Sequence, residues 1–175
     1  MWVTDESVAN LTYGDINTWD VSAITDFSML FMGREGFNSD ISNWDVSNGD
    51  NFGNMFLRAH SFNQDISSWD VSSGETFDHM FNGATAFDKD ISDWDVSSGT
   101  NFNYMFRYGT FNQDISSWDV SSEAYISYMF EYNTSMQAGQ GVDANPDRSY
   151  FVGDPGGDIT PVSYTHLTLP TIALV

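Results

Sequence analysis

The sequence predicts an α/β repeat solenoid of about five 25-residue units, with short parallel strands on one face and short helical turns on the other. Five of the six tryptophans are spaced 25, 25, 25 and 24 residues apart, and the twelve residues FNQDISSWDVSS occur twice unchanged. The hydrophobic pattern also changes its period within each unit. A fixed period of this length is typical of units that stack on one another and bury one continuous core.

The strand of each unit is predicted at the segment Ile-x-x-Trp-x-Val, because Trp and Val alternate with polar residues as in a half-buried strand. The recurring positions are Ile16, Ile41, Ile66, Ile91 and Ile115, then Trp19, Trp44, Trp69, Trp94 and Trp118, then Val21, Val46, Val71, Val96 and Val120. Since no single unit can bury these side chains, we expect them to form the core of the stack.

A short helical turn is predicted at the segment Phe-x-x-Met-Phe, because its apolar residues fall at positions i, i+3 and i+4. Residues of types that cap helices precede it in most units, such as Thr100–Asn101. Asn and Asp then predict the turn into the next unit at Asn38, Asn63, Asp88 and Asn112.

The consensus FNxDISxWDVSxxxxFxxMF resembles the BspA-like leucine-rich-repeat surface proteins, specifically their 25-residue branch with mycoplasma-lipoprotein-type repeats. The resemblance covers residues 15–131, and it departs from the usual pattern at Ser73–Gly74 and Ser98–Gly99, where many members carry Asn-Val. It implies a leucine-rich-repeat-like fold and a bacterial surface or secreted protein that acts in adhesion.

The chain divides into four parts by composition. Residues 1–14 are expected to be a partial N-terminal repeat or cap, 15–131 the repeats, and 132–160 an acidic Gly/Pro-rich degenerate repeat or linker. The segment VSYTHLTLPT resembles the translated read-through of a sequencing-library adapter, so residues 161–175 are expected not to be biological. The chain would then be a fragment of a longer protein with further repeats or other domains.

The charge balance limits the partners. The chain has 25 Asp plus Glu against 5 Lys plus Arg, a formal charge of −20. Such a surface repels nucleic-acid phosphates and anionic lipids. No apolar run is long enough for a transmembrane helix, and the start of the chain lacks the features of a signal peptide. We therefore expect no nucleic acid and no membrane insertion, and as partner a protein or glycan surface of a host or neighbouring cell.

An outward row of acidic and hydroxyl residues is the candidate binding site. If Trp and Val point inward, the residues between them point outward and form ladders along the stack about 4.8 Å apart. The rows are Asp20, Asp45, Asp70, Asp95 and Asp119, and Ser22, Ser47, Ser72, Ser97 and Ser121. They are interpreted either as a strip that binds cations, a glycan or a basic protein, or as Asp–Ser pairs that fix each loop. A second row, Asp15, Asp40, Asp65, Asp90 and Asp114, is predicted to cap turns.

A weak calcium-binding motif follows the repeats. Asp143, Asn145 and Asp147 place oxygen atoms at alternate residues, and Asp154 falls at the twelfth position of the loop. This spacing is similar to that of an EF-hand loop, but Arg148 takes the place of the required glycine. The alternative is an acidic linker without metal.

No catalytic set is evident. His60 and His79 lie at unrelated positions of the repeat, and no Ser-His-Asp arrangement, phosphate loop or dinucleotide fingerprint occurs. The sequence thus predicts a non-enzymatic protein that requires no cofactor but could bind calcium. It is expected to act either in binding or as a structural spacer of a larger surface protein, which calcium could stabilise.

Overall fold

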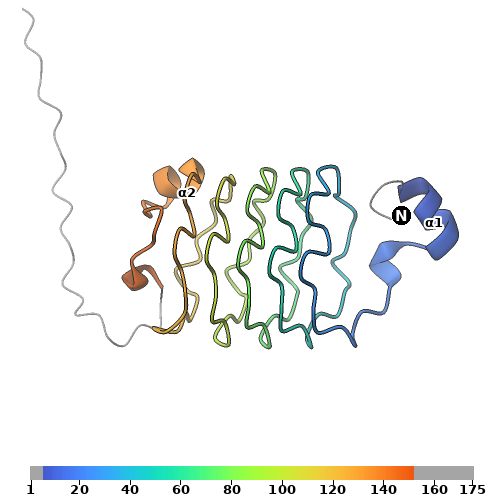
Figure 1. Ribbon diagram of the computed structural model, residues 1–175, viewed down its shortest axis with the longest axis horizontal. Helices are drawn as coiled ribbons and strands as arrows, with labels where there is room; N and C mark the ends of the chain where they lie inside the picture. The colour runs from blue at the N-terminus through green and yellow to red at the C-terminus, as the bar shows by residue number, and fades with distance from the viewer. Residues whose placement is uncertain (1–5, 152–175) are drawn as a thin grey trace, which may run out of the picture.

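The computed structural model describes residues 6–151, in which the chain winds in successive coils that lie side by side (Figure 1). Helix α1 (Glu6–Tyr13) lies at one end of this stack and helix α2 (Thr134–Gly139) at the other. Two short 3-10 helices, η1 (Ile16–Thr18) and η2 (Arg148–Tyr150), complete the regular structure. Within this part of the chain there is no strand. Neighbouring units meet instead at isolated parallel bridges: Asp26↔Asn51, Asn51↔Thr76, Thr76↔Asn101 and Asn101↔Tyr125.

The predicted α/β solenoid with parallel strands is therefore wrong, and the leucine-rich-repeat architecture is not supported. Where a strand was expected, the backbone turns twice: the N–H of Trp69 donates to Ile66 O at 3.1 Å, and that of Gly74 donates to Val71 O at 2.8 Å. The carboxylate of Asp65 accepts the N–H of Ser67 at 3.1 Å. Asp side chains satisfy nearby backbone groups in this way, and such local bonds compete with a ladder.

The predicted helical turn at Phe77–Phe81 is also absent. In an α-helix the N–H groups would donate four residues back. Here Phe77, His79 and Phe81 donate instead to the next unit, at Asn101 O, Asn103 O and Met105 O, with distances of 2.8–2.9 Å. His79 has a φ of 55°, in the left-handed region that a right-handed helix excludes. Bonds between units thus replace bonds within a helix.

The predicted inward positions do form the core. In the middle of the stack Ile66, Trp69, Val71 and Phe77 are at most 4% exposed. The first unit differs, since Trp19 and Leu30 are 37% and 45% exposed at the end of the stack.

Three columns of phenylalanine rings run along the core. Equivalent rings in successive units have centroids 5.3–6.0 Å apart. The columns are Phe27, Phe52, Phe77 and Phe102; Phe31, Phe56, Phe81, Phe106 and Phe130; and Phe37, Phe62, Phe87 and Phe111. The third column was not among the core positions predicted from the sequence.

Each buried tryptophan also ties its unit to the previous one. The indole N–H of Trp94 donates to Ile66 O at 3.1 Å, and the other units repeat this bond at 2.8–3.2 Å. The core tryptophan therefore contributes a hydrogen bond as well as apolar area.

We expect the substitution Trp94→Phe to lower the free energy of unfolding by about 2 kcal/mol, because it removes the indole donor and leaves a void. Trp19→Phe is the matched control. Trp19 donates its indole N–H to Tyr13 O but is 37% exposed, so its loss should cost clearly less. Chemical denaturation measures both variants, and equal losses would contradict a role of Trp94 in joining buried units.

The segment after Phe130 packs on the last repeat. Asn133 is fully buried, caps α2 by accepting the N–H of Met136, and donates to Phe106 O at 3.3 Å. Arg148 donates to the carbonyl oxygens of Ser121 and Ala124. Residues 133–151 thus cover this end of the stack.

Candidate functional site

The outward Asp and Ser residues form local pairs. The hydroxyl of Ser47 donates to Asp45 Oδ1 at 2.6 Å and its backbone N–H donates to the same atom at 3.1 Å. The same two bonds occur at Asp20–Ser22, Asp70–Ser72 and Asp95–Ser97. In the fifth unit, Ser121 Oγ instead accepts the N–H of Glu123 at 3.2 Å. These bonds agree with the interpretation of loop-fixing pairs, while an external partner for the row stays a prediction.

Serines make three carboxyl groups of this row more acidic. The Ser22, Ser47 and Ser97 hydroxyls, with the serine N–H groups, lower the pKa values of Asp20, Asp45 and Asp95 below the ordinary value of an aspartate. At Asp45, repulsion from Asp20 acts in the opposite direction but is the smaller effect. Hydrogen bonding therefore outweighs the repulsion expected between stacked carboxylates.

This shift predicts acid sensitivity. A carboxylate with a lowered pKa in the folded state stabilises the fold above its ordinary pKa, and this stabilisation is lost as the pH falls through the lowered value. We expect the melting temperature to drop below about pH 4. The double variant Ser47→Ala/Ser97→Ala should show a shallower drop, and identical pH profiles would contradict the assignment.

The second aspartate row caps turns, as predicted. Each carboxylate accepts the backbone N–H two residues later at 2.9–3.1 Å, from Asn17, Ser42, Ser67, Ser92 and Ser116. Two shallow hollows of about 360 and 340 Å³ lie along this row. Lys89 shares the first hollow with Asp65, Asp90 and Asp93. This row thus has a structural role in every unit.

Two of the four predicted calcium ligands are engaged elsewhere, and one lies outside the described residues. Asn145 Oδ1 accepts the N–H of Tyr128, and Asp147 caps η2 by accepting the N–H of Ser149 at 2.9 Å. Asp143 is exposed, and Asp154 lies beyond the described residues. Among residues 6–151 no group of three or more His, Cys, Asp or Glu is placed to hold a metal ion. The calcium site stays a prediction.

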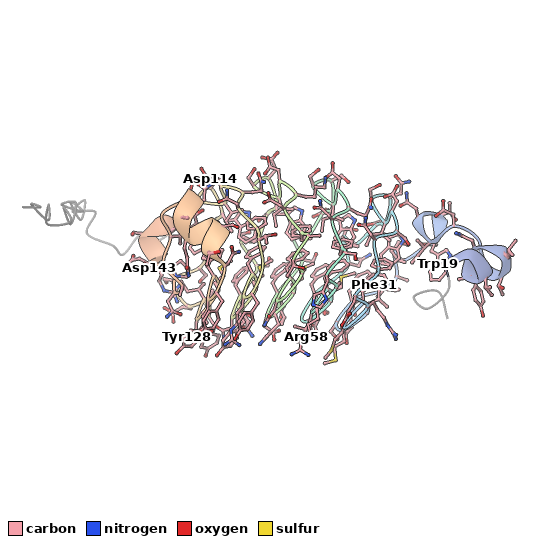
Figure 2. All side chains as sticks on the ribbon, turned by 90° about the horizontal axis from the view of Figure 1, so that it is seen from above. Trp19, Phe31, Arg58, Asp114, Tyr128 and Asp143 are labelled. Atoms are coloured by element: carbon pink, nitrogen blue, oxygen red, sulfur yellow. The ribbon has the colours of Figure 1, made fainter. Side chains whose placement is uncertain are left out.

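A second surface, which sequence reasoning missed, is a groove of about 830 Å³. Met29, Met32 and Leu57 supply apolar atoms, and Arg58 and Arg107 supply positive charge. Twelve residues line the groove, none of them Asp or Glu. Figure 2 shows Arg58 and Tyr128 along one side of the stack and Asp114 along the opposite side. We call this surface the cationic groove.

A row of stacked rings adjoins the cationic groove. Tyr108 stacks on Tyr132 at 4.7 Å, and His79 stacks on Tyr104 at the same distance. The guanidinium carbon of Arg107 lies 4.5 Å from the Tyr108 ring centroid, a cation–π distance. Its Nε lies 2.6 Å from Glu131 Oε2, an ion pair that lacks the alignment of a hydrogen bond. The side chains at this end of the groove are therefore closely packed.

The sequence did contain a signal for the groove. Three of the five basic residues, Arg34, Arg58 and Arg107, lie 13–15 residues after the Trp of their own unit. Two of them line the groove. Aligning the rare basic residues on the repeat would have placed them on one side of the stack.

Comparison with protein families identifies the repeat. The family model described as "Mycoplasma protein of unknown function, DUF285" matches residues 3–110 and again 75–144. The chain belongs to this family. The two overlapping matches to DUF285 span all five units, which is consistent with a repeat protein of the kind found on cell surfaces. Searches of curated proteins and of solved structures found no match. None of the helices within residues 6–151 has the length and apolarity to span a bilayer.

Proposed function

We propose that this DUF285 chain is a non-enzymatic binding module of a cell-surface or secreted protein, used in adhesion. The observation that carries the proposal is the exposure of the same polar groups at the same position of successive units, as in the Asp–Ser rows. Stacked repeats commonly use such extended surfaces for recognition. The family match supports the surface assignment.

The expected partner is a protein or glycan on a host or neighbouring cell, and the module would be carried by further repeats or other domains of a parent chain. Immobilised 175-residue chain should capture at least one ligand from a glycan array or a panel of purified extracellular-matrix proteins. A lack of binding across both panels would overturn the proposal.

The second candidate function is a structural spacer that holds another domain away from the cell. The local Asp–Ser bonds favour it, because they use the outward side chains to fix the loops. The double variant Asp45→Asn/Asp70→Asn separates the two functions. Weakened capture supports recognition by the row, whereas unchanged capture with a lower melting temperature supports a spacer role for that row.

We also propose that the fold needs no cofactor and that calcium is dispensable. At Asp45 the bonds from Ser47 outweigh the repulsion from Asp20 without a cation. The melting temperature should be the same in millimolar calcium and in a chelator. A rise with calcium would revive the cation interpretation of the ladder and of the Asp143 loop.

A further inference from the structure

We propose that the cationic groove binds an acidic segment of a partner protein, in which carboxylates alternate with apolar anchor residues. The proposal rests on the proposed binding function and deepens it by assigning the surface and the chemistry of the partner. It adds a second recognition surface, on the side of the stack opposite Asp114 (Figure 2).

The charges of the groove favour an anionic ligand. Arg58 is exposed and forms no ion pair within residues 6–151, although the whole chain carries a formal charge of −20. Arg107 adds a second guanidinium, partly neutralised by Glu131. Arginine pairs well with carboxylates because its planar fork can donate two parallel hydrogen bonds. Glu35 and Asp78 lie beside the groove as partners of its two histidines, His60 and His79. An approaching carboxylate therefore pairs best with Arg58, which has no acidic partner among residues 6–151.

An unpartnered amide lies between these charges. Asn82 lines the groove and is only 8% exposed, yet its side-chain amide has no hydrogen-bond partner among the described residues. Its backbone is engaged, since Asn82 O accepts the N–H of Arg58 at 2.8 Å. The buried polar atoms without a partner among the described residues are Arg107 Nε and Asn112 Oδ1, so the Asn82 amide is not sealed from solvent. It can therefore donate to a ligand carboxylate at the floor of the groove.

The groove also offers apolar contacts. Met29 and Met32 are 59% and 47% exposed, and exposed methionines adapt to varied apolar partners. Gly83, with a φ of 73°, replaces the tyrosine found at this repeat position in the next unit, Tyr108. No side chain at residue 83 separates Arg58 from Tyr108 in this row, and a Cβ there would lie 3.4 Å from Arg58 Cγ. This space suits an apolar side chain next to a carboxylate.

The aromatic and backbone groups favour a peptide held by its side chains over a glycan. Tyr108, the tyrosine that lines the groove, stacks on Tyr132 and has the Arg107 guanidinium over its ring. The adjoining Tyr104 is stacked between His79 and Tyr128, so both rings already have partners that a sugar would have to replace. The N–H groups of Gly33, Arg58 and Gly83 already donate to the next unit at 2.7–2.8 Å. A ligand peptide could not pair with these backbone N–H groups as an added strand, because they are already engaged. The ligand is therefore recognised through the side chains of Arg58, Asn82 and the apolar residues.

The test uses the full chain and a fluorescent 12-residue peptide in which Glu and Leu alternate. Anisotropy should show binding that weakens with salt, and the substitution Arg58→Gln should weaken it about ten-fold. Arg34→Gln is the matched control, because Arg34 is exposed and does not line the groove. Asn82→Ala should also weaken binding, while leaving the salt dependence nearly unchanged.

The comparison ligands are a peptide of alternating Glu and Ser, one of alternating Lys and Leu, and an oligogalacturonate of similar length. Clearly weaker binding of all three supports the proposal. Stronger binding of the oligogalacturonate, or equal effects of Arg58→Gln and Arg34→Gln, would overturn it. If matrix or glycan capture persists while no peptide binds, only the groove assignment fails. If neither assay shows binding, the proposed function fails as well.

Discussion

Replacing Phe81 by alanine is expected to lower the free energy of unfolding by about 3–5 kcal/mol. Phe81 is 1% exposed, and its ring centroid lies 5.5 Å from that of Phe56, 5.7 Å from Phe106 and 4.0 Å from Phe87. Because the ring joins three units, its removal leaves a cavity that both neighbouring units border. Urea denaturation measures the loss, with the slope expected to stay the same.

The control for this variant is Leu11→Ala on α1. Leu11 is 89% exposed, so the change should stay within about 0.5 kcal/mol. A loss below about 1 kcal/mol for Phe81→Ala would show that the phenylalanine columns do not carry the core.

The second large effect is expected for Gly99→Ala, which should cost about 1–3 kcal/mol. A Cβ atom at Gly99 would lie 2.2 Å from Phe102 Cζ and 2.9 Å from Val96 O. The Phe102 ring cannot move freely, since it stacks on Phe77 at 5.3 Å. Thermal unfolding of the purified variant measures the loss.

Gly36→Ala is the matched control, because no atom lies within 4 Å of a Cβ at that position. It should leave the melting temperature unchanged or slightly raised. If Gly99→Ala is equally harmless, the ring of Phe102 does not occupy the space above Gly99.

The core could be predicted from the sequence because burial follows from periodicity alone. Ile66, Trp69 and Val71 recur at fixed positions in every unit, and stacking is the arrangement that buries them all. The secondary structure could not be predicted in this way, because the same spacing of residues fits both a strand and two successive turns. Asp65 and Ser67 decide between them through a local hydrogen bond that periodicity does not reveal.

The prediction of a helical turn was wrong for a related reason. The spacing of Phe77, Met80 and Phe81 fits one face of a helix, but it also fits a backbone that donates alternate N–H groups to the next unit. Left-handed residues recur at the same repeat positions, including His79, Tyr104 and Tyr128. Non-glycine residues seldom adopt this conformation, so their types gave no warning of it.

The candidate sites also differ in how far the sequence predicts them. The aspartate rows followed from alternation, and the structure adds the serine bonds that lower the pKa values of Asp20 and Asp45. The cationic groove is not periodic: it depends on Gly83 lacking a side chain and on Arg58 and Arg107 appearing in separate units. A search for what every repeat shares therefore finds the scaffold and misses the surface that differs between repeats.

The core, the ladders and the groove all depend on equivalent positions of successive units being neighbours. The most direct test is the distance between spin labels on cysteines introduced at Ala23, Ser98 and Ser122, because the chain has no cysteine of its own and all three positions are exposed. The pair at positions 23 and 98 is three units apart, and the pair at 23 and 122 is four units apart. Electron paramagnetic resonance should give about 15 Å for the first pair and about 20 Å for the second, at ~4.8 Å per unit. Equal distances, or separations of several tens of ångströms, would contradict the stack.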